Sequence, residues 1–113
     1  MGATDFYNDY IGKATPEEAF SELVQSSRDY EGKRSYTGSI CEKDSFIMKE
    51  CPPRMDPYDY ADSIISDNDK WGPAFCVEYK GSYLMKIKKQ PYNSWCKGKK
   101  GIRAYLFFGY ASY

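Results

Sequence analysis

Carboxylates, lysines, tyrosines and four cysteines are the side chains with which this 113-residue chain could do chemistry, because it contains no histidine. Without histidine, Ser-His and Cys-His nucleophile pairs and histidine-containing metal sites are not available. Cys41, Cys51, Cys76 and Cys96 also lack the C-x-x-C spacing that zinc sites and redox motifs show. The composition therefore predicts a protein that is not an enzyme and that uses no metal or other cofactor.

Positive charge is concentrated in the C-terminal part of the chain. Residues 70–113 contain nine Lys or Arg residues and a single acidic residue, Glu78. The stretch KGKKG at 97–101 could contact phosphates, since glycines admit a close approach and lysines supply charge, although it lacks the P-loop pattern. With nearby aromatic rings it could bind single-stranded nucleic acid or a protein partner. The alternative is a solvated hairpin end whose lysines discourage aggregation. The basic candidates for partner binding are Lys86, Lys88, Lys89, Trp95, Lys97, Lys99, Lys100 and Arg103.

Negative charge is concentrated in the N-terminal part, where residues 1–69 carry 15 Asp or Glu against 7 Lys or Arg. An acidic surface of this kind could enter a basic groove on a partner in the way that DNA phosphates do. The aspartates do not have the D-x-D-x-D-G spacing of a calcium loop. The alternatives are a solvated helix face and mutual neutralisation of the two charged halves within one fold. The acidic candidates are Asp56, Asp59, Asp62, Asp67 and Asp69.

Two helices are predicted from their start signals. Thr15 is an N-cap, Pro16 occupies the first helical position, and Glu18 completes a capping box with Thr15. A second, shorter helix begins in the same way, with Asp56 as N-cap and Pro57 after it, and ends near residues 67–69.

Strands are predicted from alternation and from turn residues between them. The pair Lys43-Asp44 suits a hairpin between the first two strands, and Lys80-Gly81-Ser82 suits a hairpin between the next two. The tail, 97–113, contains the longest strand-like segment, and both of its faces are largely apolar, as in the central strand of a sheet. The predicted strands are Tyr36–Glu42, Ser45–Lys49, Ala74–Tyr79, Tyr83–Lys89 and the tail.

The element order α-β-β-α-β-β-β predicts a single α+β domain over residues 1–113. We expect a mostly antiparallel sheet of about five strands with two helices packed on one face. Residues 1–14 are predicted to be an irregular N-terminal arm. No apolar run approaches the length of roughly 20 residues that a membrane span needs, and the N-terminus is polar and acidic. These features predict a cytoplasmic protein with free thiols that does not contact a membrane.

Two patches of sequence resemble known proteins. They are TPEEAF with YTGSICEKDSFIM, at residues 15–20 and 36–48, and DKWGPAFCVE with LFFGYAS, at residues 69–78 and 106–112. Together they resemble short, largely uncharacterised proteins of bacteriophages, plasmids and other mobile elements. The resemblance implies an accessory protein that acts by binding, as anti-CRISPR proteins do when they block host defence. It transfers no functional residue to this chain.

The sequence as a whole predicts a non-enzymatic binding protein that engages a host protein or nucleoprotein complex through a charged aromatic surface. Inhibition of a host defence complex of CRISPR type is the most specific form of this hypothesis. Two alternatives stay open: a small nucleic-acid-binding module that uses the basic C-terminal half, and a structural accessory protein whose charged ends drive self-association.

Overall fold

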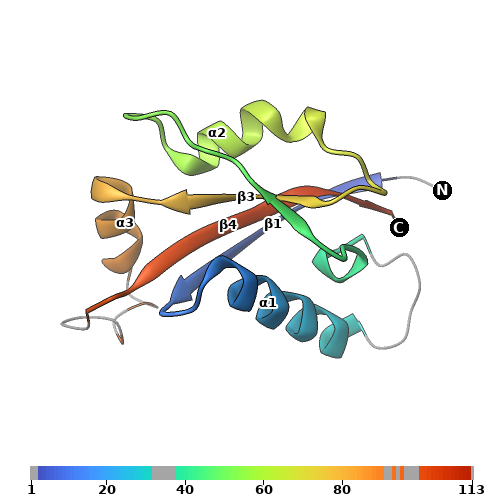
Figure 1. Ribbon diagram of the computed structural model, residues 1–113, viewed down its shortest axis with the longest axis horizontal. Coiled ribbons are helices and arrows are strands. Elements are labelled where there is room, and N and C mark those ends of the chain that lie inside the picture. Colours follow the sequence, from blue (N-terminus) through green and yellow to red (C-terminus); the bar gives the residue numbers. More distant parts are fainter. Residues whose placement is uncertain (1–2, 32–37, 91–92, 94, 96–99, 113) are drawn as a thin grey trace.

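The computed structural model describes residues 3–31, 38–90, 93, 95 and 100–112, which form an α+β fold (Figure 1). In chain order its helices and strands are β1 (Ala3–Gly12), α1 (Pro16–Glu31), the 3-10 turn η1 (Ile40–Glu42), β2 (Phe46–Met48), α2 (Pro57–Ile64), the 3-10 turn η2 (Ile65–Asp67), β3 (Ala74–Tyr79), α3 (Gly81–Lys88) and β4 (Arg103–Ser112). No helix among these described residues is long and apolar enough to cross a membrane.

The sheet is mixed and has the strand order β1-β4-β3-β2. β4 pairs antiparallel with both of its neighbours, β1 and β3, whereas β2 pairs parallel with β3. The prediction of a central C-terminal strand is therefore confirmed. The described part of the chain forms four strands rather than five, and one of the pairings is parallel.

Helices cover both faces of this sheet, so the prediction of two helices on one face was wrong. Tyr105 and Phe107 of β4 point to the face covered by α1, where Phe20 packs on Phe107 with ring centroids 5.6 Å apart. Leu106 and Phe108 point to the opposite face, covered by α2 and α3. Figure 1 shows α2 and α1 on opposite sides of the strands. The apolar character of both faces of β4 requires this arrangement, because each face must be buried against a helix.

The segment predicted to be an irregular arm is instead strand β1, at one edge of the sheet. Its ten residues pair with β4, so that Phe6 lies opposite Gly109 and Tyr10 opposite Tyr105. Phe6 is buried among the residues under α1. Sequence alternation was weak here because an edge strand is only partly buried. The partner strand lies about a hundred residues away in the chain, which local patterns cannot reveal.

The predicted strand Tyr83–Lys89 is the helix α3, and Lys80-Gly81-Ser82 is its start rather than a hairpin loop. Gly81 has a φ of 59° and turns the chain sharply after β3. Tyr83, Leu84 and Ile87 then pack on the core, whereas Met85 is 53% exposed. A short apolar run fits both the period of a strand and that of a helix, which explains the error.

The predicted hairpin around Lys43-Asp44 is also absent. Tyr36 and Thr37 lie outside the described residues, and residues 38–42 form a bend and the turn η1. The predicted strand Ser45–Lys49 is confirmed as β2, but it pairs with β3 rather than with the preceding segment. Lys43 is not an exposed turn residue: its side chain is buried, and its ammonium donates to the Asp69 carbonyl of a distant loop.

Both predicted helices are confirmed with their caps. The Glu18 N–H donates to Thr15 Oγ1 (3.3 Å) and the Thr15 N–H donates to Glu18 Oε1 (3.1 Å), which is the reciprocal pair of a capping box. At the start of α2, the Tyr58 N–H donates to Asp56 Oδ1 at 2.8 Å. Local signals were sufficient here because a cap is made by residues within one turn.

Candidate functional site

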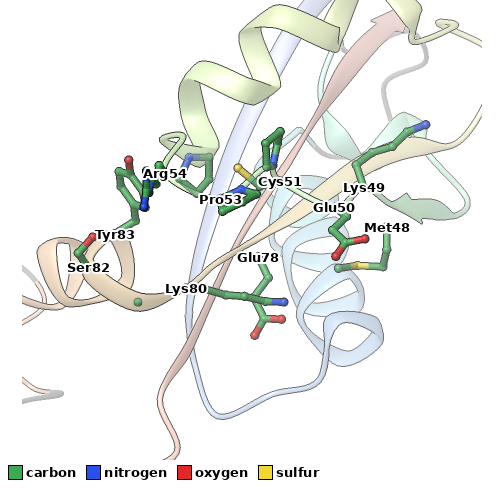
Figure 2. A pocket seen from close by; sticks show the side chains of 13 residues that line it. Met48, Lys49, Glu50, Cys51, Pro53, Arg54, Glu78, Lys80, Ser82 and Tyr83 are labelled. Atoms are coloured by element: carbon green, nitrogen blue, oxygen red, sulfur yellow. The ribbon is translucent and has the colours of Figure 1, made fainter.

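A cleft of about 880 Å³ lies at the edge of the sheet where β2 ends (Figure 2). One wall is the segment 48–54 together with Pro57, and the other is formed by Glu78, Lys80 and the start of α3. Its volume falls in the range of about 300 to 1,000 Å³ that is usual for ligand sites. This cleft is the candidate functional site.

The cleft exists because β2 is much shorter than its neighbour β3. Pairing between the two strands covers Phe46–Met48 and Ala74–Cys76, and it ends with the Lys49 N–H donating to the Cys76 carbonyl at 2.7 Å. Pro52-Pro53 then carries the chain away, since proline cannot supply the N–H that a ladder needs. β3 continues to Tyr79 and leaves an open edge beside the cleft.

A tight turn with an unusual residue forms one end of the cleft. The Met55 N–H donates to the Pro52 carbonyl (3.3 Å), and Arg54 has a φ of 65°. Proline at the second position and a positive φ at the third are the marks of a type II turn, where glycine is the usual third residue. Arg54 is the non-glycine residue with positive φ among the described residues. Such a conformation costs about 1 to 3 kcal/mol.

Two of the charged groups that line the cleft already have partners. The Glu78 carboxylate accepts a hydrogen bond from Arg103 Nε at 3.1 Å, in an ion pair across β3 and β4. The Lys49 ammonium lies 4.4 Å from the centre of the Phe75 ring, and Figure 2 shows this side chain extending away from the cleft. Arg54, Lys80 and Glu50 are the charged side chains that remain to meet a ligand.

Cys51 contributes a thiol to the cleft, but not an activated one. Its Sγ–H donates to the Met55 carbonyl at 3.3 Å, and burial, helped by the negative charge of Asp56, raises the pKa of the thiol. A raised pKa leaves little thiolate, which is the nucleophilic form. Cys41, Cys51 and Cys76 are all free, as the sequence predicted for its cysteines, whereas Cys96 lies outside the described residues. The part of the chain that the structure describes contains no group of three or more Cys, Asp or Glu side chains placed to hold a metal ion.

The basic candidates from the sequence lie elsewhere. Lys86 and Lys88 occupy the last turn of α3 and Lys89 is its C-cap, where positive charge complements the helix dipole. Lys100 is exposed just before β4, and Trp95 is 48% exposed. Lys97 and Lys99 lie outside the described residues.

Arg103 forms an ion pair with Glu78, and its guanidinium lies 5.3 Å from the centre of the Tyr105 ring. The structure thus brings the three α3 lysines together but gives Arg103 a role within the fold.

The acidic candidates have mostly local partners. Asp56 caps α2, Asp62 accepts a hydrogen bond from the Tyr7 hydroxyl (3.2 Å), and Asp69 accepts one from the Trp71 N–H (2.9 Å). Asp59 and Asp67 are exposed on α2 and η2. None of the acidic or basic candidates that the structure describes lines the cleft.

A second exposed feature is Trp71, which is 64% exposed on the loop before β3. The loop is fixed by the buried ammonium of Lys43, which donates to the Asp69 and Gly72 carbonyls at 2.8 Å each and to the Lys70 carbonyl at 3.3 Å. Burial lowers the pKa of Lys43, while the charge of Asp69 opposes that shift. These hydrogen bonds tie residues 69–72, and with them the loop that carries Trp71, to Lys43.

The sequence reasoning missed the cleft because its walls come from three separate segments. Two local signals were available. Pro52-Pro53-Arg54-Met55 is a turn sequence without the glycine that a type II turn favours, and Lys80-Gly81 marks a change of direction after a strand. Neither signal shows that the two segments lie beside each other.

The chain was compared with family models, with curated proteins and with solved structures, and it matches none of them. The evidence for function is therefore the site itself.

Proposed function

We propose that this chain is a non-enzymatic binding protein that holds a protein partner in the cleft at the open edge of β3. The observation that carries the proposal is the position of the cleft: it lies beside backbone groups of β3 that β2 leaves unpaired. An unpaired strand edge is a template for another chain, and natural proteins usually cover such edges unless they are used. Cys51, the thiol among the described residues that line the cleft, has a raised pKa and is not an activated nucleophile, which fits a binding role better than a catalytic one.

The setting of this function is also a proposal. The resemblance to short proteins of bacteriophages and mobile elements favours a host protein or nucleoprotein complex in the cytoplasm as the partner, and inhibition of a defence complex as the outcome. The cleft gives that hypothesis a surface on which it can be tested.

Site-specific crosslinking tests the proposed function. The photo-reactive residue p-benzoylphenylalanine is placed at Met48, which lines the cleft and is 45% exposed, or at Tyr30, which is 89% exposed on α1. Each protein is irradiated in lysate of the cells that naturally carry the chain, with and without nuclease. We expect a single, nuclease-resistant protein adduct at Met48 and none at Tyr30. Equal yields from both positions, or loss of the adduct after nuclease treatment, would refute the proposal.

A nucleic-acid-binding function is the second candidate, favoured by the three lysines at the end of α3. Binding of a fluorescent oligo-dT strand to the chain and to the variant K86A/K88A/K89A, across a salt series, distinguishes the two functions. A nucleic-acid module would lose affinity in the variant and show a shallower salt dependence, because each phosphate contact contributes to the slope. The protein-binding proposal expects weak binding that is the same for both proteins.

A further inference from the structure

We propose that the cleft binds an extended acidic segment of the partner. This segment adds to the sheet as a strand beside the end of β3, and Arg54 recognises its acidic side chains. This inference rests on the proposed function and specifies its ligand. Four observations on the walls of the cleft lead to it.

The first observation concerns the backbone of β3. The Cys76 carbonyl points toward β2, where it accepts the Lys49 N–H. Because backbone groups alternate in direction along a strand, the N–H and C=O of Glu78, two residues later, point to the same edge. Val77, between them, pairs with Leu106 on the β4 side. In the described chain the β2 pairing stops at Cys76, so Glu78 offers a donor and an acceptor to a new strand.

The second observation is the direction that a new strand beside Glu78 of β3 would take. A chain in that position continues the line of β2, which runs parallel to β3. It then passes Glu78 and Lys80 and reaches the start of α3, between the two walls of the cleft. Strand residues advance by about 3.3 Å each, so three or four residues cover this part of β3. Main-chain hydrogen bonds of this kind provide affinity for an extended segment without fixing its sequence.

The third observation is charge. Glu78 is neutralised by Arg103, and Lys49 is turned to the Phe75 ring. Among the described residues that line the cleft, Arg54 and Lys80 remain, and Glu50 is the carboxylate that opposes them. Complementarity with this net positive cleft favours acidic side chains on the incoming strand. Figure 2 shows Arg54 beside Tyr83 at the end of the cleft nearest α3, and Glu50 and Met48 at the other end.

The fourth observation is the conformation of Arg54. Its positive φ is one that glycine adopts without strain, and its side chain is exposed. Within the described residues its guanidinium makes no hydrogen bond or ion pair that would compensate for this strain. Strained residues of this kind are concentrated at functional sites. A guanidinium suits the task, because its planar donors match both oxygens of a carboxylate. The structure thus assigns Arg54 to ligand recognition rather than to folding.

Stability and binding should therefore respond in opposite directions to Arg54→Gly. The glycine variant relieves the positive φ, so its midpoint of thermal unfolding should stay the same or rise by a few degrees. Its affinity for an acidic strand should fall at least tenfold. Arg54→Lys keeps a charge but not the bidentate geometry, and should give an intermediate affinity. Lys86→Ala, a change of the same charge outside the cleft, is the matched control and should leave the affinity unchanged.

The probe is the peptide acetyl-Val-Glu-Val-Glu-Val-amide, with Lys in place of Glu as the charge control and an N-methylated version that cannot donate main-chain hydrogen bonds. Binding is followed through the Glu78 amide by NMR and hydrogen exchange. We expect the acidic peptide to shift and protect this amide, with at least tenfold tighter binding than the Lys peptide or the N-methylated peptide. Equal binding of the three peptides, no response of Glu78 at millimolar peptide, or unchanged binding by Arg54→Gly would overturn the inference. So would a Glu78 shift that depends on protein concentration alone, since the occupant would then be a second copy of the chain.

The two proposals can fail separately. If p-benzoylphenylalanine at Met48 captures a partner but Glu78 does not respond to the acidic peptide, the cleft binds a protein in another manner and only this inference is wrong. If neither position in the cleft responds, the proposed function is wrong as well.

Discussion

Gly109 of β4 lies so close to the side chain of Asn68 that a β-carbon at residue 109 would be 2.5 Å from Asn68 Oδ1. The same amide oxygen accepts the Tyr110 N–H at 2.9 Å, and Asn68 Nδ2 donates to the Pro73 carbonyl at 2.8 Å. Asn68 is 8% exposed, so the loop before β3 is joined to the central strand through one buried amide. The fit depends on the absence of a side chain at residue 109.

Gly109→Ala should therefore destabilise the fold by about 3 kcal/mol, because the new methyl group would displace a buried amide that has two good hydrogen bonds. Urea unfolding measures the change. Gly101→Ala is the matched control: both glycines have a positive φ, 156° at Gly109 and 76° at Gly101, but no described residue lies within 4 Å of the β-carbon position of Gly101. The control should lose only the stability that it costs to place alanine at a positive φ, about 1 kcal/mol. Equal losses in the two variants would show that the contact with Asn68 is unimportant.

Lys43→Met should cost about 2 to 4 kcal/mol, because it leaves the Asp69 and Gly72 carbonyls without their donor in a buried site. It should also loosen the loop that carries Trp71, which amide hydrogen exchange of residues 69–72 would detect. Lys80→Met, at an exposed lysine, is the control and should change stability by less than about 0.5 kcal/mol. A Lys43→Met variant as stable as the parent would mean that the carbonyls find water instead.

Stability should fall as the pH rises through the range of tyrosine ionisation. Burial raises the pKa of Tyr105 from its ordinary value of 10.0 to about 12, and it likewise raises the pKa of Tyr7 to about 12. A raised pKa in the folded state means that the folded chain keeps the proton between pH 10 and 12 while the unfolded chain loses it. The stabilisation is thus fully present below pH 10 and is lost as the pH rises through 12.

Tyr105→Phe separates this effect from packing. The Tyr105 hydroxyl donates to the Ala14 carbonyl at 2.9 Å, so the variant should lose about 1 kcal/mol at neutral pH. Between pH 10 and 12 its unfolding free energy should fall less steeply than that of the parent. Urea titrations at pH 8, 10, 11 and 12 make the comparison, and parallel curves for the two proteins would contradict it.

Phe6→Ala should cost about 3 to 5 kcal/mol, because Phe6 is a buried aromatic side chain of β1. Tyr30→Ala, at a side chain that is 89% exposed, serves as the control and should lie within about 0.5 kcal/mol of the parent. Thermal unfolding distinguishes the two cases, and a small effect of Phe6→Ala would argue against the β1–β4 pairing.

Features made by residues close in sequence were predicted well. The capping box of Thr15 and Glu18 and the cap of Asp56 appear as expected, because each is formed within one turn of helix. The alternating apolar faces of residues 104–108 placed β4 at the centre of the sheet, since a strand buried on both sides must be apolar on both sides.

Features that depend on contacts between distant residues were not predicted. The pairing of Phe6 with Gly109, the parallel register of Met48 with Cys76, and the burial of Lys43 beneath residues 69–72 all join segments at least 25 residues apart. The helix α3 was mistaken for a strand because Tyr83, Leu84 and Ile87 show their helical spacing only once a core is present to receive them.

An α+β chain, two capped helices, a buried C-terminal strand and a strong separation of charge could be predicted from the residues alone. The roles of the charged side chains could not, because they depend on how the chain folds. The tertiary structure used Asp56 and Arg103 to hold the fold, buried Lys43, and left Arg54 and Lys80 in an open cleft. The sequence shows only that a charged residue is present. Whether that residue is paired, buried or free depends on its partners, and these are set by the packing of segments that are far apart in the chain.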